Sequence, residues 1–140
     1  MMRLCQTRLF FDTEPREIRE ITGEVAGWVA EQAIGSGLLT LFIQHTSASL
    51  LVQENASPEV RRDLDAFLRR LVPEDPHLYR HADEGPDDMP AHLKSALTQV
   101  QLTIPVVEGR LALGTWQGIF LLEHRASPHR RSLVLTLIGD

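Results

Sequence analysis

The sequence predicts a compact single domain of the α+β class, spanning residues 1–140, with a mostly antiparallel β-sheet and about three helices. A chain of 140 residues corresponds to one domain that can bury its own core. Helical periodicity is confined to the first two thirds of the chain, and the last third consists of strand-like runs separated by turn residues. Neither an internal repeat nor a linker divides the chain.

The first third is expected to form a strand, a helix and a second strand. Residues 3–11 are strand-like, and residues 17–33 repeat apolar side chains every three or four positions, which predicts an amphipathic helix. The glycines in residues 35–37 are expected to end that helix, because glycine readily takes the left-handed conformation of a helix terminus. Residues 38–45 predict a buried strand whose odd positions share one face and end at His45.

The middle third is expected to contain two helices joined by a polar loop. Residues 57–71 begin with Ser-Pro-Glu, in which the serine can cap the helix, the proline suits its first turn and the glutamate favours its positive end. The proline-rich residues 73–88 form a loop of a length that is usually functional or mobile. A shorter third helix follows, with an aspartate cap and Pro90 in its first turn.

The last third is expected to be β-structure. Two strands within residues 101–113 meet at Glu108-Gly109 in a hairpin, and Pro105 indicates an edge strand or a bulge there. Residues 118–125 and 132–140 predict two more strands. The resulting order, β-α-β-α-α-β-β-β-β, is typical of an α+β domain.

Composition excludes several classes of partner. The net charge of −5 gives no electrostatic footprint for nucleic acid. No apolar run approaches the ~20 residues that span a bilayer, and no signal peptide is recognised, so we expect a cytoplasmic protein without a membrane partner. The single cysteine, Cys5, excludes an internal disulfide and a thiolate metal cluster. Basic residues are almost all arginine, and Lys94 is the only lysine.

Three histidines are candidate metal ligands. His45 lies at the end of a predicted strand, His81 in the long loop, and His92 near the start of the third helix. Asp88 precedes His92 by four residues, so the two side chains project on one side of that helix. Imidazoles with a nearby carboxylate can form an open divalent-metal site. The alternatives are that Asp87 or Asp88 is a helix cap, and that His45 is a hydrogen-bonded core residue.

Charged residues near the C-terminus allow two interpretations each. Glu123 and Arg125 end an apolar strand face and form either an internal salt bridge or the lining of a site. Arg130 and Arg131 either hold an anion, most naturally a phosphate, or form a solvated edge. No nucleophilic serine motif, P-loop or dinucleotide fingerprint is present.

Several long motifs resemble the YjbQ-like family, which is also labelled secondary thiamine-phosphate synthase. They are QHTSASL, EN with VRRDL, HADEGPDDMPAHLKSAL and LGTWQGIFLLEHR, in order and in register from about Gln6 to Gly139. The resemblance implies a compact α+β fold, a homotrimer and a cytoplasmic location. The activity attached to the label joins a pyrimidine pyrophosphate to a thiazole phosphate and releases pyrophosphate.

The resemblance also assigns site residues. The family's polar motif positions fall here on His45, Thr46, Ser47, Asn55, Asp63, His81, Asp87, Asp88, His92, Trp116, Gln117, Glu123 and Arg125. Near the C-terminus, the family's HGGSRR is replaced by the shorter SPHRR, which lacks glycine and puts the roles of Arg130 and Arg131 in doubt.

From these observations we expect His45, His81 and His92 to converge on a divalent metal, either zinc or a magnesium- or manganese-like ion. Asp87 or Asp88 would be a further ligand or would orient an imidazole. The residues expected to be catalytic are His45, Asp88, Glu123 and Arg125. Those expected to bind the ligand are Thr46, Ser47, Asn55, Trp116, Gln117, Arg130 and Arg131. The metal would neutralise a leaving pyrophosphate.

Two other functions stay open on the sequence. One is a metal-dependent hydrolase of a small phosphorylated metabolite, and the other is a non-catalytic trimer that binds metal or phosphate. The homotrimer has a separate motivation, since nine glycines and many apolar strand residues suggest sheet edges that need covering.

Overall fold

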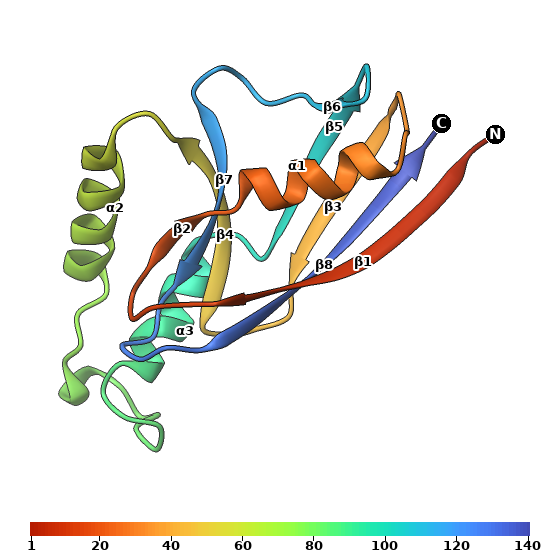
Figure 1. Ribbon diagram of the computed structural model, residues 1–140. Helices are drawn as coiled ribbons and strands as arrows, with labels where there is room; N and C mark the ends of the chain where they lie inside the picture. Colours follow the sequence, from red (N-terminus) through yellow and green to blue (C-terminus); the bar gives the residue numbers. More distant parts are fainter.

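The computed structural model describes residues 1–140 as an α+β domain, as the sequence predicts (Figure 1). Its elements are β1 (Arg3–Asp12), β2 (Ile18–Glu20), α1 (Thr22–Glu31), β3 (Gly37–Ile43), β4 (Ala48–Glu54), α2 (Pro58–Leu71), the 3-10 helix η1 (Pro76–Leu78), α3 (Asp88–Leu97), β5 (Gln101–Val107), β6 (Arg110–Leu111), β7 (Gln117–Glu123) and β8 (Arg130–Gly139). The two chain ends lie side by side, and the terminal ammonium group is 3.1 Å from Asp140 Oδ1. None of the helices is both long and apolar enough to cross a bilayer.

The strands form two sheets, although the sequence suggested one. The larger sheet has the order β1-β8-β3-β5-β6, the smaller has the order β2-β7-β4, and every pairing is antiparallel. The split follows from β4 (Ala48–Glu54), a strand that the sequence interpretation missed. The sequence predicts no element for the residues between His45 and Ser57, but in the structure Ala48 already pairs with Glu123 of β7.

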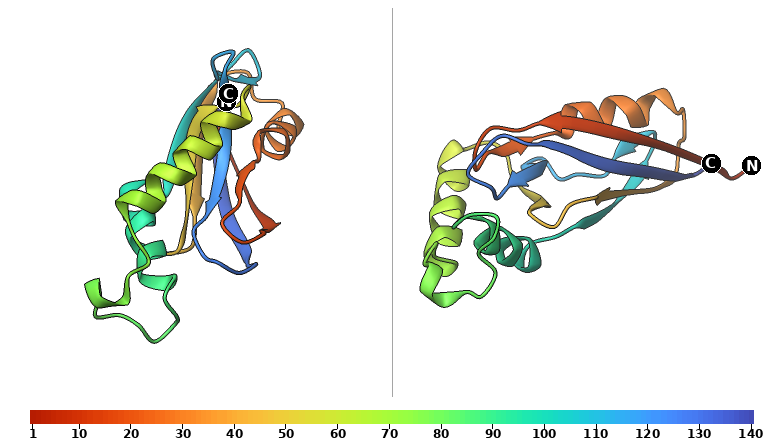
Figure 2. Two further views of the ribbon diagram at one scale, coloured as in Figure 1. Left: turned by 90° about the vertical axis from the view of Figure 1, so that its left-hand side faces the viewer. Right: turned by 90° about the horizontal axis from the view of Figure 1, so that it is seen from below.

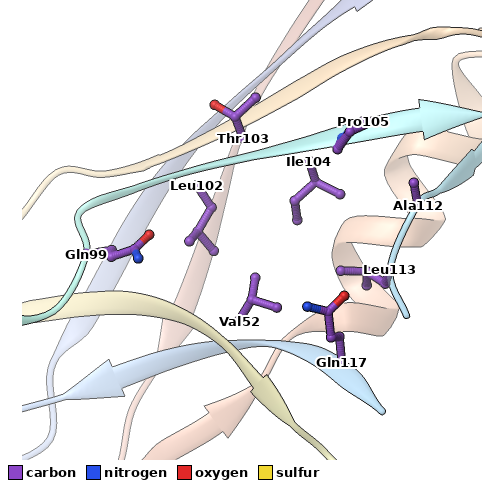
Figure 3. A pocket seen from close by; sticks show the side chains of 9 residues that line it. All are labelled: Val52, Gln99, Leu102, Thr103, Ile104, Pro105, Ala112, Leu113 and Gln117. Atoms are coloured by element: carbon purple, nitrogen blue, oxygen red, sulfur yellow. The ribbon is translucent and has the colours of Figure 1, made fainter. Parts of the chain in front are cut away.

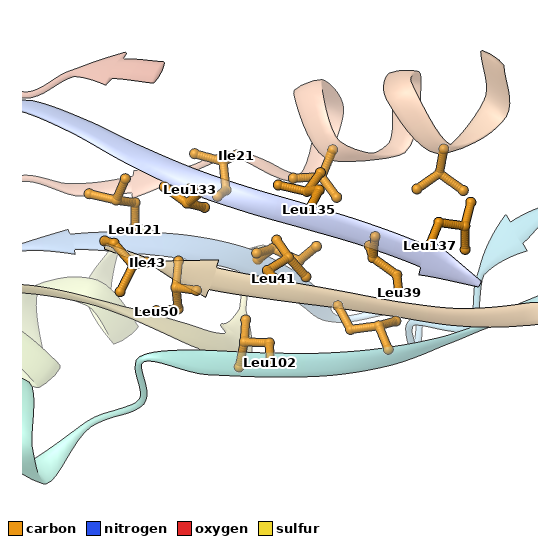
Figure 4. Close-up of a cluster of buried hydrophobic side chains, with 14 of the residues drawn as sticks. Ile21, Leu39, Leu41, Ile43, Leu50, Leu102, Leu121, Leu133, Leu135 and Leu137 are labelled. Atoms are coloured by element: carbon orange, nitrogen blue, oxygen red, sulfur yellow. The ribbon is translucent and has the colours of Figure 1, made fainter. Parts of the chain in front are cut away.

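The main core lies between the two sheets and α1 (Figure 4). As the alternation predicted, Leu39, Leu41 and Ile43 of β3 all point inward and are fully buried. They pack with the inward residues of β8 and with Val25 and Val29 of α1. Burying each such aliphatic side chain contributes about 1.5–3 kcal/mol, so this cluster dominates the stability of the domain.

The helix α2 covers the other face of the smaller sheet (Figures 1 and 2). Leu68 of α2 packs on Phe120 and Leu122 of β7. Because β7 is buried on both faces, its apolar residues are continuous rather than alternating. The predicted N-cap of this helix is confirmed, since Ser57 Oγ accepts a hydrogen bond from the Glu59 N–H at 3.3 Å.

The predicted helix over residues 17–33 is wrong in its first turn. Residues 18–20 form β2, in which Ile18 pairs with Leu122, and the helix begins only at Thr22. The spacing of Ile18 and Ile21 fits a helical repeat, but isoleucine is also a favoured strand residue. Pairing with β7 decides for the strand, because it satisfies backbone groups at that edge of the smaller sheet.

Glycine serves a different purpose at the end of α1 than the sequence predicted. The left-handed residue is Ala33, with φ of 53°, rather than one of the glycines that follow. Gly37 is required for close approach instead, since a Cβ there would lie 2.4 Å from the Ile138 carbonyl oxygen. The hairpin at Glu108-Gly109 is confirmed, and both residues have positive φ, as a two-residue turn between paired strands requires.

Candidate metal centre

Two histidines and one aspartate meet at the start of α3. Asp88 and His92 lie one helical turn apart, and the preceding loop brings His81 beside them. Asp88 Oδ2 is 2.7 Å from His81 Nε2 and 3.1 Å from His92 Nε2. One ligand atom from each of the three residues lies within 4.8 Å of the others. The predicted pairing of Asp88 with His92 across a turn therefore places both at one point.

Each of two ligand candidates is oriented by a second contact. His92 Nδ1 donates a hydrogen bond to the Thr46 carbonyl oxygen at 2.9 Å. In the neutral ring this leaves the lone pair on Nε2, aimed at Asp88 Oδ2 and His81. The other oxygen of Asp88, Oδ1, is 3.1 Å from Arg125 Nη1. Metal ligands in proteins are usually oriented in this way, with the imidazole held through its second nitrogen and the carboxylate through its second oxygen.

Asp87 does not cap α3, although the sequence left that possibility open. Its side chain makes no cap hydrogen bond, and Asp87 Oδ2 instead accepts hydrogen bonds from Arg125 Nε and the Ala126 N–H, both at 2.8 Å. Burial alone would raise the pKa of Asp87, but the hydrogen bonds from Arg125 and Ala126 outweigh burial and lower it. The hydrogen bond that Arg125 donates to Asp87 also raises the pKa of Arg125. Asp87 therefore fixes Arg125, and Arg125 in turn fixes Asp88.

The donor set fits a divalent transition metal. Two imidazole nitrogens and one carboxylate oxygen form the ligand set of many catalytic zinc and non-haem iron sites, which keep a further position open. The side chains of His81 and His92 are 42% and 31% exposed, whereas that of Asp88 is 5% exposed. A metal held here would thus be anchored on one buried carboxylate and accessible from the histidine side.

The structure places His45 near this cluster but outside it. Its Nε2 accepts a hydrogen bond from the Ser132 N–H at 2.9 Å, and Arg131 Nη1 is 3.4 Å from its Nδ1. Burial, and then the charge of Arg131, lower the pKa of His45 and keep the ring neutral at pH 7. His45, Thr46 and His92 line one open hollow of about 520 Å³. The cluster therefore differs from the predicted one. It contains two of the three histidines and Asp88, and His45 lies on the wall of the adjacent hollow.

Glu123 and Arg131 form a buried ion pair behind the site. Glu123 Oε1 accepts hydrogen bonds from Arg131 Nε at 2.7 Å and from the Thr13 hydroxyl at 2.6 Å. Burial alone would raise the pKa of Glu123, but these hydrogen bonds lower it. Arg131 also donates to the carbonyl and hydroxyl oxygens of Ser47, at 3.2 and 3.0 Å. This pair matches the salt-bridge interpretation of Glu123, with Arg131 rather than Arg125 as its partner.

The remaining predicted ligand-binding residues lie elsewhere in the chain. Arg130 is exposed and its guanidinium stacks on Phe10, 4.6 Å from the ring centroid. Asn55, Trp116 and Gln117 lie at the far end of β4 and β7, where Glu54 pairs with Gln117. Gln117 and Glu123 are the two ends of the seven-residue strand β7, so about 20 Å along the strand separates them.

Gln117 borders a different hollow, of about 340 Å³, between β5 and the strands of the smaller sheet (Figure 3). Figure 3 shows Val52, Leu102, Ile104 and Leu113 around the space, together with the polar side chains of Gln99, Thr103 and Gln117. No histidine or carboxylate lines it, so it does not belong to the candidate metal centre. Asp63 of α2 is exposed and also lies outside that centre.

The sequence did not predict the burial of two basic residues. Lys94 and His124 are 4% and 5% exposed, and each lies within a motif that carries the family resemblance without being assigned a role there. Burial, and then the charge of Lys94, lower the pKa of His124 to about 3. The one available signal was compositional, since Lys94 is the only lysine in a chain that otherwise uses arginine.

Comparisons with known proteins agree with the resemblance. The family model described as UPF0047 protein YjbQ-like matches residues 7–140. The UPF0047 protein sll1880 of Synechocystis sp. is 47% identical over 138 residues, which cover 99% of this chain and 94% of that protein. The UPF0047 protein YjbQ of Escherichia coli O157:H7 is 42% identical over 136 residues, covering 96% and 98%.

Solved structures share the fold. The conserved hypothetical protein TT1486 of Thermus thermophilus is 40% identical, with a TM-score of 0.80 over 91% of this chain and 97% of that chain. A YbjQ-like protein of Sulfolobus solfataricus has a TM-score of 0.88 over the full length of both chains at 23% identity, which shows the fold alone. The chain belongs to the UPF0047 YjbQ-like family.

Proposed function

We propose that this protein is a metal-dependent enzyme acting on a small phosphorylated metabolite, with His81, Asp88 and His92 holding a divalent ion. The observation that carries this proposal is the orientation of His92. Its Nδ1–H donates to the Thr46 carbonyl, so the Nε2 lone pair of the neutral ring faces an Asp88 oxygen only 3.1 Å away. Two acceptors facing each other at this distance repel unless a cation or a proton lies between them.

The surrounding residues support catalysis as well as binding. A bound divalent ion would neutralise negative charge on a departing phosphate or pyrophosphate group. Arg125, fixed by Asp87, adds a positive charge beside Asp88 without competing for the histidines. His45 borders the same hollow as His92, and the Arg131 guanidinium lies 3.4 Å from its Nδ1. His45 and Arg131 thus add polar groups to the wall of the hollow beside the proposed metal.

For the reaction we propose the one that the family resemblance implies. A pyrimidine pyrophosphate is joined to a thiazole phosphate, and the bond to pyrophosphate breaks with its electron pair leaving on pyrophosphate. The charge that develops on this leaving group is the main requirement of the step, and the metal with Arg125 would meet it. With water as the nucleophile, the same residues would hydrolyse a phosphorylated metabolite instead.

Metal content tests the binding half of the proposal. Elemental analysis of purified wild-type protein should find about one divalent ion per chain, and Asp88→Asn and His92→Ala should each lose most of it. His77→Ala is the matched control, because His77 is exposed in η1 and lies outside the cluster. Full metal content in both cluster variants would refute the site.

Product analysis tests the catalytic half. Metal-loaded protein is incubated with the pyrimidine and thiazole substrates, and the products are separated. Formation of thiamine phosphate with equimolar pyrophosphate supports coupling, whereas release of phosphate or pyrophosphate without coupling supports hydrolysis. If the loaded protein leaves every candidate unchanged and chelation only lowers its melting temperature, the metal is structural and the enzyme proposal fails.

We also propose that the chain assembles as a homotrimer. Exposed apolar side chains gather on the outer face of the larger sheet: Leu4, Ile138 and Leu38 are adjacent across three paired strands and 42–60% exposed. Phe10 and Phe42 lie on the same face, beyond a polar row of Gln6, Thr136 and Thr40. Large exposed apolar side chains gathered on one face of a sheet favour an interface there. Sedimentation at micromolar concentration should give a trimer for the wild type and a smaller species for Phe42→Glu, and a wild-type monomer would contradict the proposal.

A further inference from the structure

Lys94 is a buried cation without a counter-charge. It projects from α3 and is 4% exposed. No carboxylate oxygen lies within 4.0 Å of its ammonium group, and that group donates no hydrogen bond to any protein atom. The stem of Lys94 is buried, but its ammonium lies on the wall of an open hollow, where water or an anion can reach it. A lysine held in this way without an ion pair is available to bind an anion.

The surroundings of Lys94 are cationic overall. It lines an open hollow of about 280 Å³ together with Arg16, Arg69 and Glu74, and a separate small hollow together with Asp65 and Glu123. Glu74 pairs with Arg16, Asp65 lies 3.1 Å from Arg69, and Glu123 pairs with Arg131. The three carboxylates are therefore already matched with arginines, and the ammonium of Lys94 is the surplus charge.

Arg16 provides a second unpartnered donor at the same place. Its Nε is buried and has no hydrogen-bond partner. The backbone of Arg16 is also held in the left-handed region, with φ of 53°, by a hydrogen bond from its N–H to the Arg125 carbonyl. Buried donors without partners are rare in folded proteins and indicate a ligand or an ordered water. Two side chains with an unpartnered donor, Lys94 and Arg16, thus border one hollow.

We propose that Arg16, Arg69 and Lys94 form a second binding site, which takes a phosphate group of a small metabolite. The guanidinium groups of the two arginines offer planar pairs of donors that match phosphate oxygens, and Lys94 supplies the compensating point charge. The hollow has room for a phosphate and part of the group that carries it.

This site is distinct from the candidate metal centre and does not depend on the proposed function. Lys94 follows His92 by two residues, which is about 200° around a helix, so the two side chains leave α3 on nearly opposite sides. None of His81, Asp88 and His92 lines the hollow beside Lys94. The same helix nevertheless carries both sites, so an anion bound at Lys94 contacts the element that positions Asp88.

Calorimetric titration with inorganic phosphate tests the site. Metal-free protein in chelator is used, so that phosphate cannot bind through a metal. The wild type should bind phosphate, and Lys94→Met should weaken binding about 10- to 100-fold, the value of one charge-assisted hydrogen bond. Arg69→Met should weaken it to a similar extent, and Lys94→Arg should retain most of the affinity. Methionine is close to lysine in shape, so Lys94→Met should fold, which a melting curve verifies.

Two controls separate this site from nonspecific attraction and from the metal centre. Arg70→Met removes a positive charge adjacent to Arg69 that does not line the hollow, and it should leave phosphate affinity unchanged. Asp88→Asn should also leave it unchanged while abolishing metal binding. No phosphate binding by the wild type at millimolar concentration, or equal losses in Lys94→Met and Arg70→Met, would overturn the proposal and leave the metal centre untouched.

Discussion

Replacing His124 by glutamine should remove much of the acid sensitivity of this protein between pH 7.5 and pH 5. His124 is 5% exposed, and its Nε2 lies 2.8 Å from the Ser49 hydroxyl. Burial, and then the nearby charge of Lys94, lower its pKa from 6.5 to about 3. The unfolded chain therefore binds a proton at this residue long before the folded protein does.

The sign and size of the effect follow from this difference. Stability is fully present above pH 6.5 and is lost as the pH falls toward 3, because protons favour the unfolded state throughout that range. Each pH unit below 6.5 costs about 1.4 kcal/mol, so His124 should remove about 2 kcal/mol of unfolding free energy at pH 5 relative to pH 7.5. The lowered pKa of His45 contributes in the same direction and remains in the variant.

The assay is urea denaturation of wild type and His124→Gln at several pH values, in chelator so that metal release does not contribute. The wild type should lose about 2 kcal/mol more than the variant over this interval. His77→Gln, which alters an exposed histidine of η1, should follow the wild-type curve. Parallel curves for wild type and His124→Gln would refute the claim that His124 is buried in its neutral form.

Three further predictions concern the buried pair and the glycines. Glu123→Ala should lower the free energy of unfolding by about 3–5 kcal/mol, because it leaves the Arg131 guanidinium buried without its partner. The double variant Glu123→Leu with Arg131→Met should lower it by less than this single change. A larger loss in the double variant, measured by denaturation at pH 7, would count against this reasoning. Gly37→Ala should lower the melting temperature sharply, since its Cβ would lie 2.4 Å from the Ile138 carbonyl oxygen. Gly27→Ala, inside α1 with nothing within 4 Å of the new Cβ, should stabilise by about 0.5–1 kcal/mol, and calorimetry showing a loss there would contradict the packing of α1.

Local patterns in the sequence identified most elements correctly. The alternation through Leu39, Leu41 and Ile43, the Ser57 cap and the Glu108-Gly109 turn are each determined by a few adjacent residues. The i,i+4 spacing of Asp88 and His92 likewise follows from helix geometry alone, and it brought two of the three cluster residues together.

Elements whose partners are distant in sequence were the ones misassigned. Residues 18–20 form β2 rather than a helical turn because β7, about 100 residues later, offers a free edge. Residues 48–54 form β4 although Ser49 is polar and buried, because its hydroxyl forms hydrogen bonds with His124 and Thr98 inside the fold. The sequence shows the hydroxyls but not the partners that make their burial favourable.

The sequence by itself determined the α+β class, the family and the residue types available for a metal site, because these depend on local periodicity and on motifs. Only the tertiary structure decided which carboxylate faces the histidines. Asp87 and Asp88 are adjacent and identical in chemistry. Asp87 nevertheless accepts hydrogen bonds from Arg125 and Ala126, whereas the carboxylate of Asp88 lies beside His81 and His92. The tertiary structure alone also left Lys94 buried without a counter-charge. Burial and ionic pairing depend on groups brought together from distant parts of the chain, and no local pattern records them.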